Sequence, residues 1–318
     1  MSAGLLDRPT DPALAFVGGT GRSGTHVLNN IIGRTSRYAR VPIEARFHVN
    51  PQGFPDLLSG EVEVERFLAK LQGFWWRRIR AGEVAPAILR SIALGRKERG
   101  LYKVVPRERF DLAVGEFASA YPDDPEQACR NLFLDLLWPL AAEARKPGLT
   151  EMSCFTIAQA PTLLRLFPDA KFVHAVRDGR DAGASKASKR QKKAHPRNGW
   201  EGLRWWEGRL AEIEKGIRGL PPGCLHTVSL DELVEGEREA AFADLMSFLE
   251  LSEEPEARGY FERQVRPEAA HKGRWRESLS ESEQLALAQE YERTLDRIDA
   301  EGFHCAALLR RTYERQPA

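Results

Sequence analysis

A glycine-rich turn near the N-terminus constrains this chain most. The apolar run at residues 14–17 reads as a buried strand that leads into the turn and then into the start of a helix. Such a turn points successive backbone N–H groups at one place, and the helix dipole adds partial positive charge there, so the turn suits a phosphate-like anion. Gly19 and Gly24 have the phosphate-loop spacing, but Thr25 stands where that pattern has Lys, and the cation, Arg22, lies inside the loop. A loop without that Lys is poorly equipped for γ-phosphate chemistry, although it can hold a 5′-phosphate.

The order of apolar runs predicts the fold. Five short runs read as strands, at residues 13–18, 39–43, 149–153, 171–176 and 224–230. Helical patterns fill the spaces between them, and strands separated by helices imply parallel pairing with right-handed crossovers. We therefore predict a single α/β domain over residues 1–318, built as a P-loop-type three-layer sandwich around a central, mostly parallel five-stranded sheet.

Apolar residues at helical spacing predict which helix faces are buried. One such face has Phe242, Leu245, Met246 and Leu249, and another has Leu285, Ala288, Tyr291, Leu295 and Ile298. Ser280 with Glu283 forms a capping box that begins the second helix. Residues 47–80 are rich in Phe, Leu and Trp, which favours helices packed on the core; the alternative is an acceptor cleft or its lid.

Composition excludes several classes of function. The net charge is +1, so binding to bulk nucleic acid is not expected. No apolar stretch approaches the length of a membrane span, and the N-terminus lacks the pattern of a signal peptide. The four cysteines have no Cys-x-x-Cys pair and the seven histidines no ligand spacing, which favours reduced thiols in a cytoplasmic protein without a bound metal.

A second motif lies much further along the chain. The run at 171–176 reads as a strand, Val-Arg-Asp follows, and Ser185 comes eight residues after Arg177. This segment and the Gly-Arg-Ser-Gly-Thr-His loop resemble the 3′-phosphate segment and the 5′-phosphosulfate loop of sulfotransferases that use 3′-phosphoadenosine-5′-phosphosulfate (PAPS). The resemblance extends from residue 13 to about residue 276. It implies transfer of a sulfuryl group to an acceptor hydroxyl, with the bisphosphate PAP as the second product.

The resemblance also implies which residues hold the donor. They are Gly21, Arg22, Ser23, Gly24, Thr25, His26, Arg177, Ser185, Lys272, Gly273 and Arg274. Arg177 offers a planar fork to the 3′-phosphate, which ATP lacks. Lys272 to Arg274 lie in a basic patch similar to the family's C-terminal Lys-Gly segment; the alternative is a merely basic loop.

The catalytic residues implied by the resemblance are Glu44, Arg22, His26 and Arg46. Glu44 lies in a Glu-x-Arg element similar to that of the tyrosylprotein and bacterial carbohydrate-type branches, where the Glu serves as general base. Arg46 is expected to orient Glu44 or to neutralise the sulfuryl group. Arg22 is expected to stabilise charge on the leaving oxygen. His26 either donates to the phosphosulfate or packs at the start of the helix.

The sequence departs from the family pattern at two places. Met152 stands where many relatives have a Lys, and Lys103 is a weak substitute for that charge. Ser229 and Leu230 replace an Arg-Tyr pair, so an adenine contact by that Tyr cannot be carried over. Asp178 and Asp181 are interpreted as caps of the helix that follows them and are left out of the site.

Two questions about partners stay open at this point. A basic run over residues 186–197 is either a solvated helix face or a track for an anionic acceptor. The acceptor is expected to be a small molecule or a glycan with a hydroxyl, such as a carbohydrate, a lipid or another small-molecule alcohol, and no oligomeric state is predicted. The rival functions are a P-loop nucleotide kinase and a non-catalytic nucleotide-binding regulatory protein.

Overall fold

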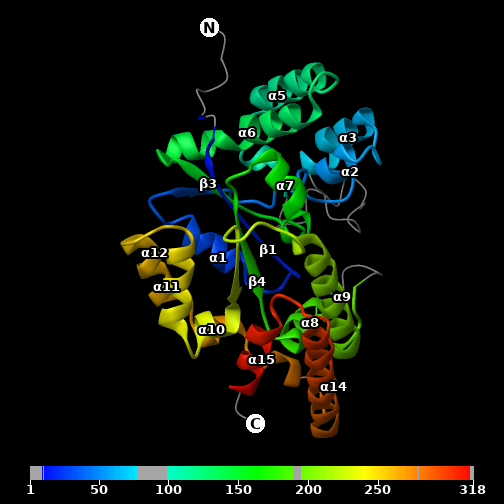
Figure 1. The fold of residues 1–318 in the computed structure, drawn as a ribbon, viewed down its shortest axis with the longest axis vertical. Coiled ribbons are helices and arrows are strands. Elements are labelled where there is room, and N and C mark those ends of the chain that lie inside the picture. The colour runs from blue at the N-terminus through cyan, green and yellow to red at the C-terminus, as the bar shows by residue number, and fades with distance from the viewer. Residues whose placement is uncertain (1–8, 10, 78–98, 189–194, 278, 316–318) are drawn as a thin grey trace, which may run out of the picture.

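The computed structural model describes residues 9, 11–77, 99–188, 195–277 and 279–315. Its centre is a five-stranded sheet whose strands are β1 (Ala13–Gly19), β2 (Tyr38–Arg40), β3 (Gly148–Met152), β4 (Lys171–Val176) and β5 (Leu225–Ser229). The strand order is β2-β3-β1-β4-β5, and every pair is parallel. The predicted strands and the predicted parallel sheet are confirmed (Figure 1).

The second strand is shorter than predicted. Val41 still donates its N–H to the carbonyl of Thr150 at 2.9 Å, which extends the ladder by one bond. Pro42 has no N–H to donate, so the pairing ends there rather than at residue 43.

Helices connect the strands and cover both faces of the sheet. Their bounds are α1 Thr25–Ile32, α2 Phe54–Leu58, α3 Val64–Lys70, α5 Arg107–Ala120, α6 Pro125–Ala144, α7 Ala160–Leu166, α8 Gly179–Ala187, α9 Gly199–Ile217, α10 Leu230–Val234, α11 Arg238–Phe248, α12 Pro255–Gln264, α13 Pro267–Ala270, α14 Glu281–Ala300 and α15 Ala306–Glu314. Short 3-10 turns lie at Leu101–Lys103, Ile157–Gln159 and Arg274–Arg276, and a π turn lies at Leu71–Trp75.

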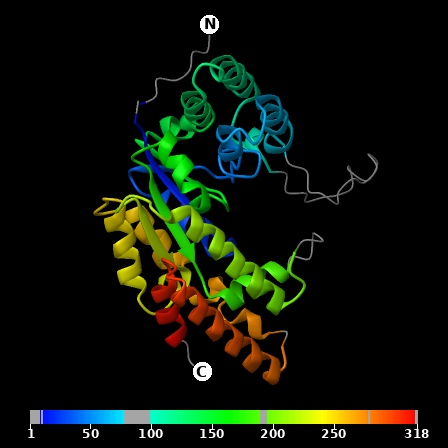
Figure 2. The same cartoon turned by 45° about the vertical axis from the view of Figure 1, so that its right-hand side comes forward.

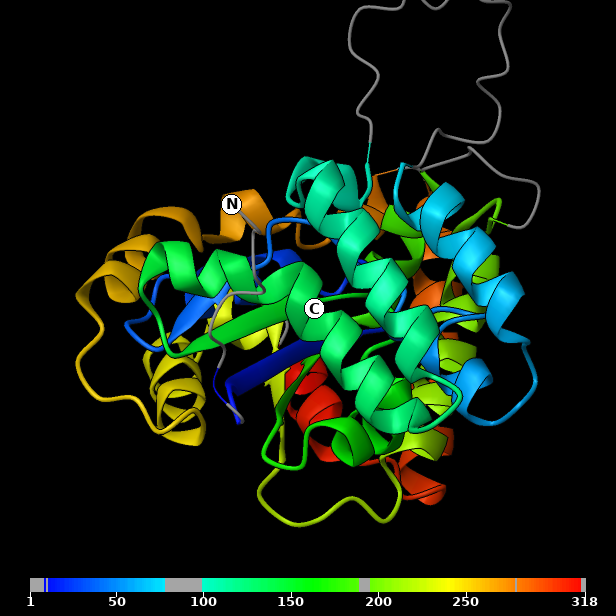
Figure 3. The ribbon, with the colours of Figure 1, turned by 90° about the horizontal axis from the view of Figure 1, so that it is seen from above.

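The three layers follow from the two-residue alternation of the buried strands. On β1, Leu14 and Phe16 pack into a core with α5, α6 and α7, whereas Ala15 and Val17 face a second core with α1, α11 and α12. Figure 2 shows α11 and α12 on one side of the sheet and α9 on the other, and Figure 3 shows α6 lying across one face. A third core joins α8, α9, α14 and α15. The predicted three-layer α/β architecture is therefore confirmed.

The predicted helix faces are confirmed with one exception. Phe242, Leu245, Met246 and Leu249 are all buried. Ser280 and Glu283 form the expected capping box of α14. Leu285 was expected on the buried face and is 63% exposed, because helix α14 begins at Glu281 with a phase that turns Leu287 inward instead.

Residues 47–77 mostly pack on the first core. Phe47, Phe54, Phe67 and Trp75 are fully buried, whereas Phe74 is 47% exposed. The core-packing interpretation therefore accounts for most of the apolar side chains in this region. Residues 78–80, the end of the region predicted as a possible acceptor lid, lie outside the described residues.

Candidate active site

The strand order places the glycine-rich loop, the predicted 3′-phosphate segment and the Glu44 element at one edge of the sheet. In parallel strands the carboxyl ends share an edge, and ligands of open α/β sheets bind there. The glycine-rich loop follows β1, and β4, which lies beside β1, leads into Arg177. On the other side of β1, β3 leads into Cys154, and the outer strand β2 leads toward Glu44. The order therefore places the predicted donor segments side by side and the predicted base on the far side of the loop.

The loop has the backbone of an anion cradle. Gly21, Arg22 and Gly24 all have left-handed φ values, of 84°, 65° and 94°. This conformation turns consecutive N–H groups toward one point. A Cβ on Gly24 would lie 2.9 Å from Leu230 Cδ1, so the loop also needs glycine for space. Among the described residues, no side chain caps α1, whose N-terminal N–H groups are thus not taken up by a cap.

A cavity of about 210 Å³ lies beside this loop. Its lining includes seven predicted donor residues: Arg22, Gly24, Thr25, His26, Arg177, Ser185 and Arg274. Arg22 Nε donates to Ser185 Oγ at 2.9 Å, which joins the loop to α8 across 163 residues of sequence. The structure therefore brings the two motifs of the predicted donor site together.

Positive charge is concentrated around this cavity. Desolvation of the guanidinium and the positive charges of Arg177 and Arg274 lower the pKa of Arg22, while Cys154 acts in the opposite direction. Arg177 is 6% exposed, and its Nε has no hydrogen-bond partner in the described part of the chain. An anion in the cavity would relieve this repulsion and satisfy buried donors, so the residues fit a phosphorylated ligand.

The residues of the third predicted motif, Lys272 to Arg274, lie in different places in the structure. Arg274 lines the cavity, but Lys272 forms an ion pair with Glu235 and lines a different, smaller cavity. The N–H of Gly273 donates to Asp181 Oδ2 at 2.8 Å. Gly21 and Ser23 do not line the cavity either, and Ser23 is fully buried. The donor roles of these four residues stay predictions.

Glu44 and Arg46 lie together beyond the other side of the loop. Arg46 donates from both Nε, at 2.6 Å, and Nη2 to the same oxygen, Glu44 Oε2. The other oxygen, Oε1, lies 3.9 Å from the Sγ of Cys154. The Glu44 side chain is 15% exposed, so it is largely buried without being sealed from solvent.

Cys154 connects this pair to the glycine-rich loop. A Cβ built on Gly21 would lie 3.9 Å from Cys154 Sγ and 3.8 Å from Cη2 of Trp205. The half-buried Trp205 of α9 thus also lies close to the loop. Cys154 and Trp205 therefore lie close to Gly21 of the loop, and Glu44 lies beside Cys154.

Sequence reasoning missed the residue that holds the Glu44 segment. Glu151, at the end of β3, is 1% exposed and accepts the N–H of Ala45 at 3.0 Å and the hydroxyl of Ser153 at 2.7 Å. Its other oxygen lies 3.0 Å from His48 Nε2, and Ser153 Oγ accepts the N–H of Arg46 at 3.2 Å. A charged residue inside an apolar strand was the available signal, because a buried carboxylate needs partners.

The residues at the departures from the family pattern also have defined places. Met152 is 3% exposed and packs in the second core, whereas Lys103 is exposed. Leu230 lines the cavity together with Val234 and Val265, so aliphatic side chains form the wall where no Tyr is available. Spacing could not predict this wall, since Leu230 and Val234 belong to α10 whereas Val265 follows α12, some 30 residues further along the chain.

The basic run is only partly described. Lys186 lies over the Trp205 ring at 4.9 Å, and Arg197 pairs with Glu201 at 2.6 Å. Lys189, Arg190, Lys192 and Lys193 lie outside the described residues. A role of this run in acceptor binding stays a prediction.

Three buried carboxylates lie behind the cavity. Asp178 caps α8 as predicted, and its own N–H donates to Asp231 Oδ2 at 2.9 Å. Asp181 was predicted as a second cap, but it accepts N–H groups from the 273–275 segment instead. Burial, and then the charge of Asp178, raises the pKa of Asp231 to about 6.

This raised pKa predicts an effect of Asp231→Asn on stability. An unfolded Asp has a pKa of about 3.9, so between about pH 4 and pH 6 the folded protein keeps a proton that the unfolded chain has released. The stabilisation from Asp231 is therefore full below pH 4 and is lost as pH rises to about 6. Asn keeps an acceptor for the Asp178 N–H and does not ionise. At pH 7.5, urea unfolding should show the variant to be more stable by about 1–3 kcal/mol.

The same measurement at pH 4 should show this advantage largely gone. The exposed Asp123→Asn is the control, because it removes a carboxylate outside the buried cluster. If the difference in the free energy of unfolding between Asp231→Asn and the wild type is the same at pH 4 and at pH 7.5, Asp231 does not titrate as described.

The described residues contain no group of three or more His, Cys, Asp or Glu side chains arranged to hold a metal ion. None of their helices combines the length and the apolar character that a bilayer crossing requires.

The model of a family described as the sulfotransferase family matches residues 13–256. No curated protein sequence matches this chain.

Several solved structures are similar to the chain. The sulfotransferase domain of the Synechococcus PCC 7002 olefin synthase is 17% identical, with 90% of this chain and 97% of that chain covered and a TM-score of 0.51. A sulfotransferase from Alicyclobacillus acidocaldarius is 12% identical, with 96% and 100% covered and a TM-score of 0.49. Retinol dehydratase in complex with retinol and PAP is 13% identical, with 92% and 83% covered and a TM-score of 0.43. The similarity to the Synechococcus domain shows a shared fold.

Proposed function

This chain belongs to the sulfotransferase family, and we propose that it transfers a sulfuryl group from PAPS to an acceptor hydroxyl. One observation carries the proposal: Arg22, Arg177 and Arg274, from three segments far apart in sequence, line one cavity beside an uncapped helix N-terminus. Guanidinium forks suit phosphate oxygens, and a bisphosphate such as PAP presents two phosphates.

The proposal assigns parts of the donor to parts of the cavity. The amides of the glycine-rich loop, with Thr25 and His26, hold the 5′-phosphosulfate. Arg177 and Ser185 hold the 3′-phosphate, and Arg22, which already bonds Ser185, reaches this end of the site with one of its five N–H donors. The aliphatic wall at Leu230 packs on the adenine.

The donor supplies the sulfuryl group, and the side chains supply positioning and a proton acceptor. As the acceptor oxygen bonds to sulfur and the bond from sulfur to the bridging oxygen breaks, the hydroxyl proton passes to Glu44. Glu44 Oε1 is the acceptor atom, because Arg46 occupies Oε2 with both of its donors. Loop amides, the α1 dipole and Arg22 stabilise the negative charge that grows on the leaving phosphate.

A titration tests the donor assignment. We expect isothermal calorimetry to show that the wild type binds PAP at least about tenfold more tightly than AMP, because each hydrogen bond to a charged group contributes about 1.5–3 kcal/mol. ATP, which also lacks the 3′-phosphate, should bind as weakly as AMP or more weakly. Equal affinities for PAP and AMP would rule out the assignment of Arg177 and Ser185.

Removal of divalent metal ions separates this proposal from a kinase. With Arg22, the loop amides and the α1 dipole in place of Mg²⁺, turnover with PAPS should stay within about twofold of its untreated value after addition of a chelator. A kinase needs the metal between its phosphates. Complete loss of turnover that added Mg²⁺ restores would favour the kinase.

The acceptor is proposed only as a class, a small molecule or glycan with a hydroxyl. The predicted single domain and cytoplasmic location stay predictions; the four cysteines at positions 129, 154, 224 and 305 are free. A mass-shift screen of a metabolite extract incubated with PAPS is the experiment that identifies the acceptor.

A further inference from the structure

One wall of the donor cavity is a segment with little support of its own. Ala270, His271 and Arg274 line the cavity; Ala270 ends the short helix α13, and Arg274 begins the turn at Arg274–Arg276. Helix α13 has four residues and buries none of them. His271 and Gly273 both have left-handed φ values, of 52° and 76°. Something outside the segment must therefore hold it against the cavity.

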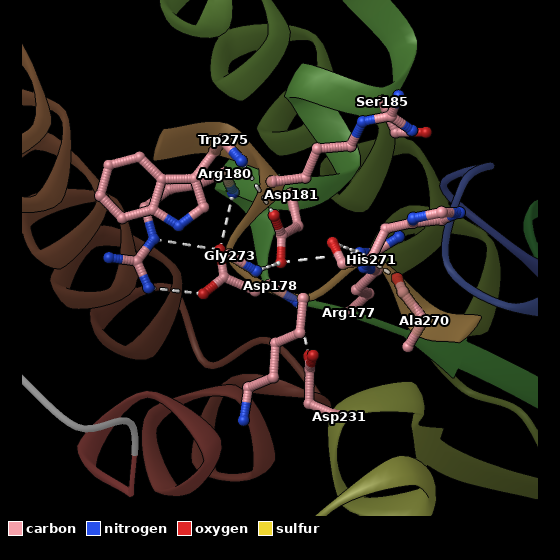
Figure 4. A network of polar contacts seen from close by, with 12 residues as sticks. Arg177, Asp178, Arg180, Asp181, Ser185, Asp231, Ala270, His271, Gly273 and Trp275 are labelled. Carbon is pink, nitrogen blue, oxygen red and sulfur yellow. Dashed lines mark hydrogen bonds and ion pairs between the residues drawn. The ribbon is translucent and has the colours of Figure 1, made fainter. Parts of the chain in front are cut away.

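We infer that Asp181 is a positioning residue. It fixes the 270–276 segment against Arg177 and so places Arg274 at the 3′-phosphate of the donor. The inference rests on the proposed function, since it concerns the same donor site. Asp181 Oδ2 accepts the N–H of Gly273 at 2.8 Å, and Oδ1 accepts the N–H of Trp275 at 3.2 Å (Figure 4). One carboxylate on α8 thus holds two backbone groups on either side of Arg274.

Arg177, two residues before the start of α8, also binds the 270–276 segment. Its Nη2 donates to the carbonyls of Ala270, at 2.8 Å, and of His271, at 3.1 Å, and lies 3.5 Å from Asp181 Oδ2. Asp181 and Arg177 are 2% and 6% exposed, so these charge-assisted bonds form away from water. The Asp181 carboxylate therefore orients both Arg177, which is proposed to bind the 3′-phosphate, and the segment that faces Arg177.

Other contacts also hold the segment, among them a hydrogen bond of 3.2 Å from Gln284 Nε2 to the carbonyl of Arg276, but they act at its far end or on its exposed surface. The buried Trp275 ring stacks with the Arg180 guanidinium at 4.6 Å, which anchors the far end of the segment. Lys272 pairs with Glu235, whose side chain is 55% exposed, and exposed ion pairs of this kind contribute little. Glu235→Gln is therefore a matched control for a change at Asp181, because it removes an acid bound to the same segment.

The test compares Asp181→Ala, Asp181→Asn and Glu235→Gln with the wild type. For Asp181→Ala we expect PAP affinity to fall at least about tenfold and AMP affinity to change by less than about threefold, with an intermediate effect for Asn, which keeps one acceptor oxygen. In turnover, the KM for PAPS should rise while kcat changes little. Trypsin should cleave Asp181→Ala faster after Lys272, Arg274 and Arg276, and PAP should protect the wild type and Glu235→Gln.

Different outcomes separate the failure of this inference from the failure of the proposed function. A wild type with no preference for PAP over AMP would contradict the proposed function. A wild type that prefers PAP, with Asp181→Ala equal to it in PAP affinity and trypsin resistance, would overturn only the inference. If both Asp181 variants fail to fold, hydrogen exchange on the wild type decides: the Gly273 and Trp275 amides should be protected when PAP is bound, and exchange at the rate of a free peptide would overturn the inference.

Discussion

Glu44→Gln is expected to lower turnover by roughly 10²–10⁴-fold and to leave PAP affinity within about twofold of the wild type. The change is nearly isosteric, and it removes the proton acceptor at Oε1. The segment should keep its place, because Glu151 accepts the N–H of Ala45 and Ser153 accepts the N–H of Arg46, and both bonds are independent of the Glu44 side chain. Single-turnover kinetics with an identified acceptor and calorimetry with PAP measure the two quantities.

The exposed Glu61→Gln is the control for a loss of one carboxylate elsewhere. Turnover of Glu44→Gln within a few-fold of the wild type would place the base elsewhere. His26, which lines the cavity and is exposed, would then be the next residue to test. His48 is a poor alternative, since it is fully buried against Glu151.

Arg22→Met is expected to lower kcat/KM for PAPS by roughly 10²–10³-fold, the loss typical for one donor that stabilises a developing anion. Arg22 lies at the centre of the cluster of positive charge, between the loop amides and Ser185. Met keeps much of the side-chain length without the charge. Because Arg22 has a left-handed φ of 65° in the wild type, the non-glycine replacement adds no new backbone strain.

Arg293→Met controls for the loss of an arginine, since that side chain is 65% exposed and pairs only on the surface of α14. The free energy of unfolding of both variants should stay close to that of the wild type. Arg22→Met with unchanged kcat/KM would show that the loop amides alone stabilise the leaving phosphate.

The fold was predictable to a large extent because its signals are local. Apolar runs gave the five strands, and their alternation with helices gave parallel pairing. The errors also have local causes: Pro42 shortens the second strand, and the phase of α14 exposes Leu285. Spacing alone could not give the strand order, which decides that Glu44 and Arg177 lie on opposite sides of the loop.

The candidate site was predictable where short motifs carry it. The structure brings Arg22, Arg177 and Ser185 to one cavity, as their motifs indicated. Asp181 was interpreted as a helix cap because sequence shows only its neighbours along the chain, whereas its partners lie 92 and 94 residues further on. The aliphatic wall of the cavity escaped prediction for the same reason.

Transfer of labelled sulfur from donor to acceptor is the reaction that the proposed function requires. Wild-type protein, with a chelator present, would be incubated with ³⁵S-labelled PAPS and a panel of hydroxyl acceptors that covers sugars, lipid alcohols, phenols and tyrosine peptides, together with a metabolite extract. A labelled product should form with the wild type, and its rate of formation should fall roughly 10²–10⁴-fold with Glu44→Gln. Tight binding of PAP with no labelled product from any acceptor would contradict sulfuryl transfer and would identify a nucleotide-binding protein without catalysis.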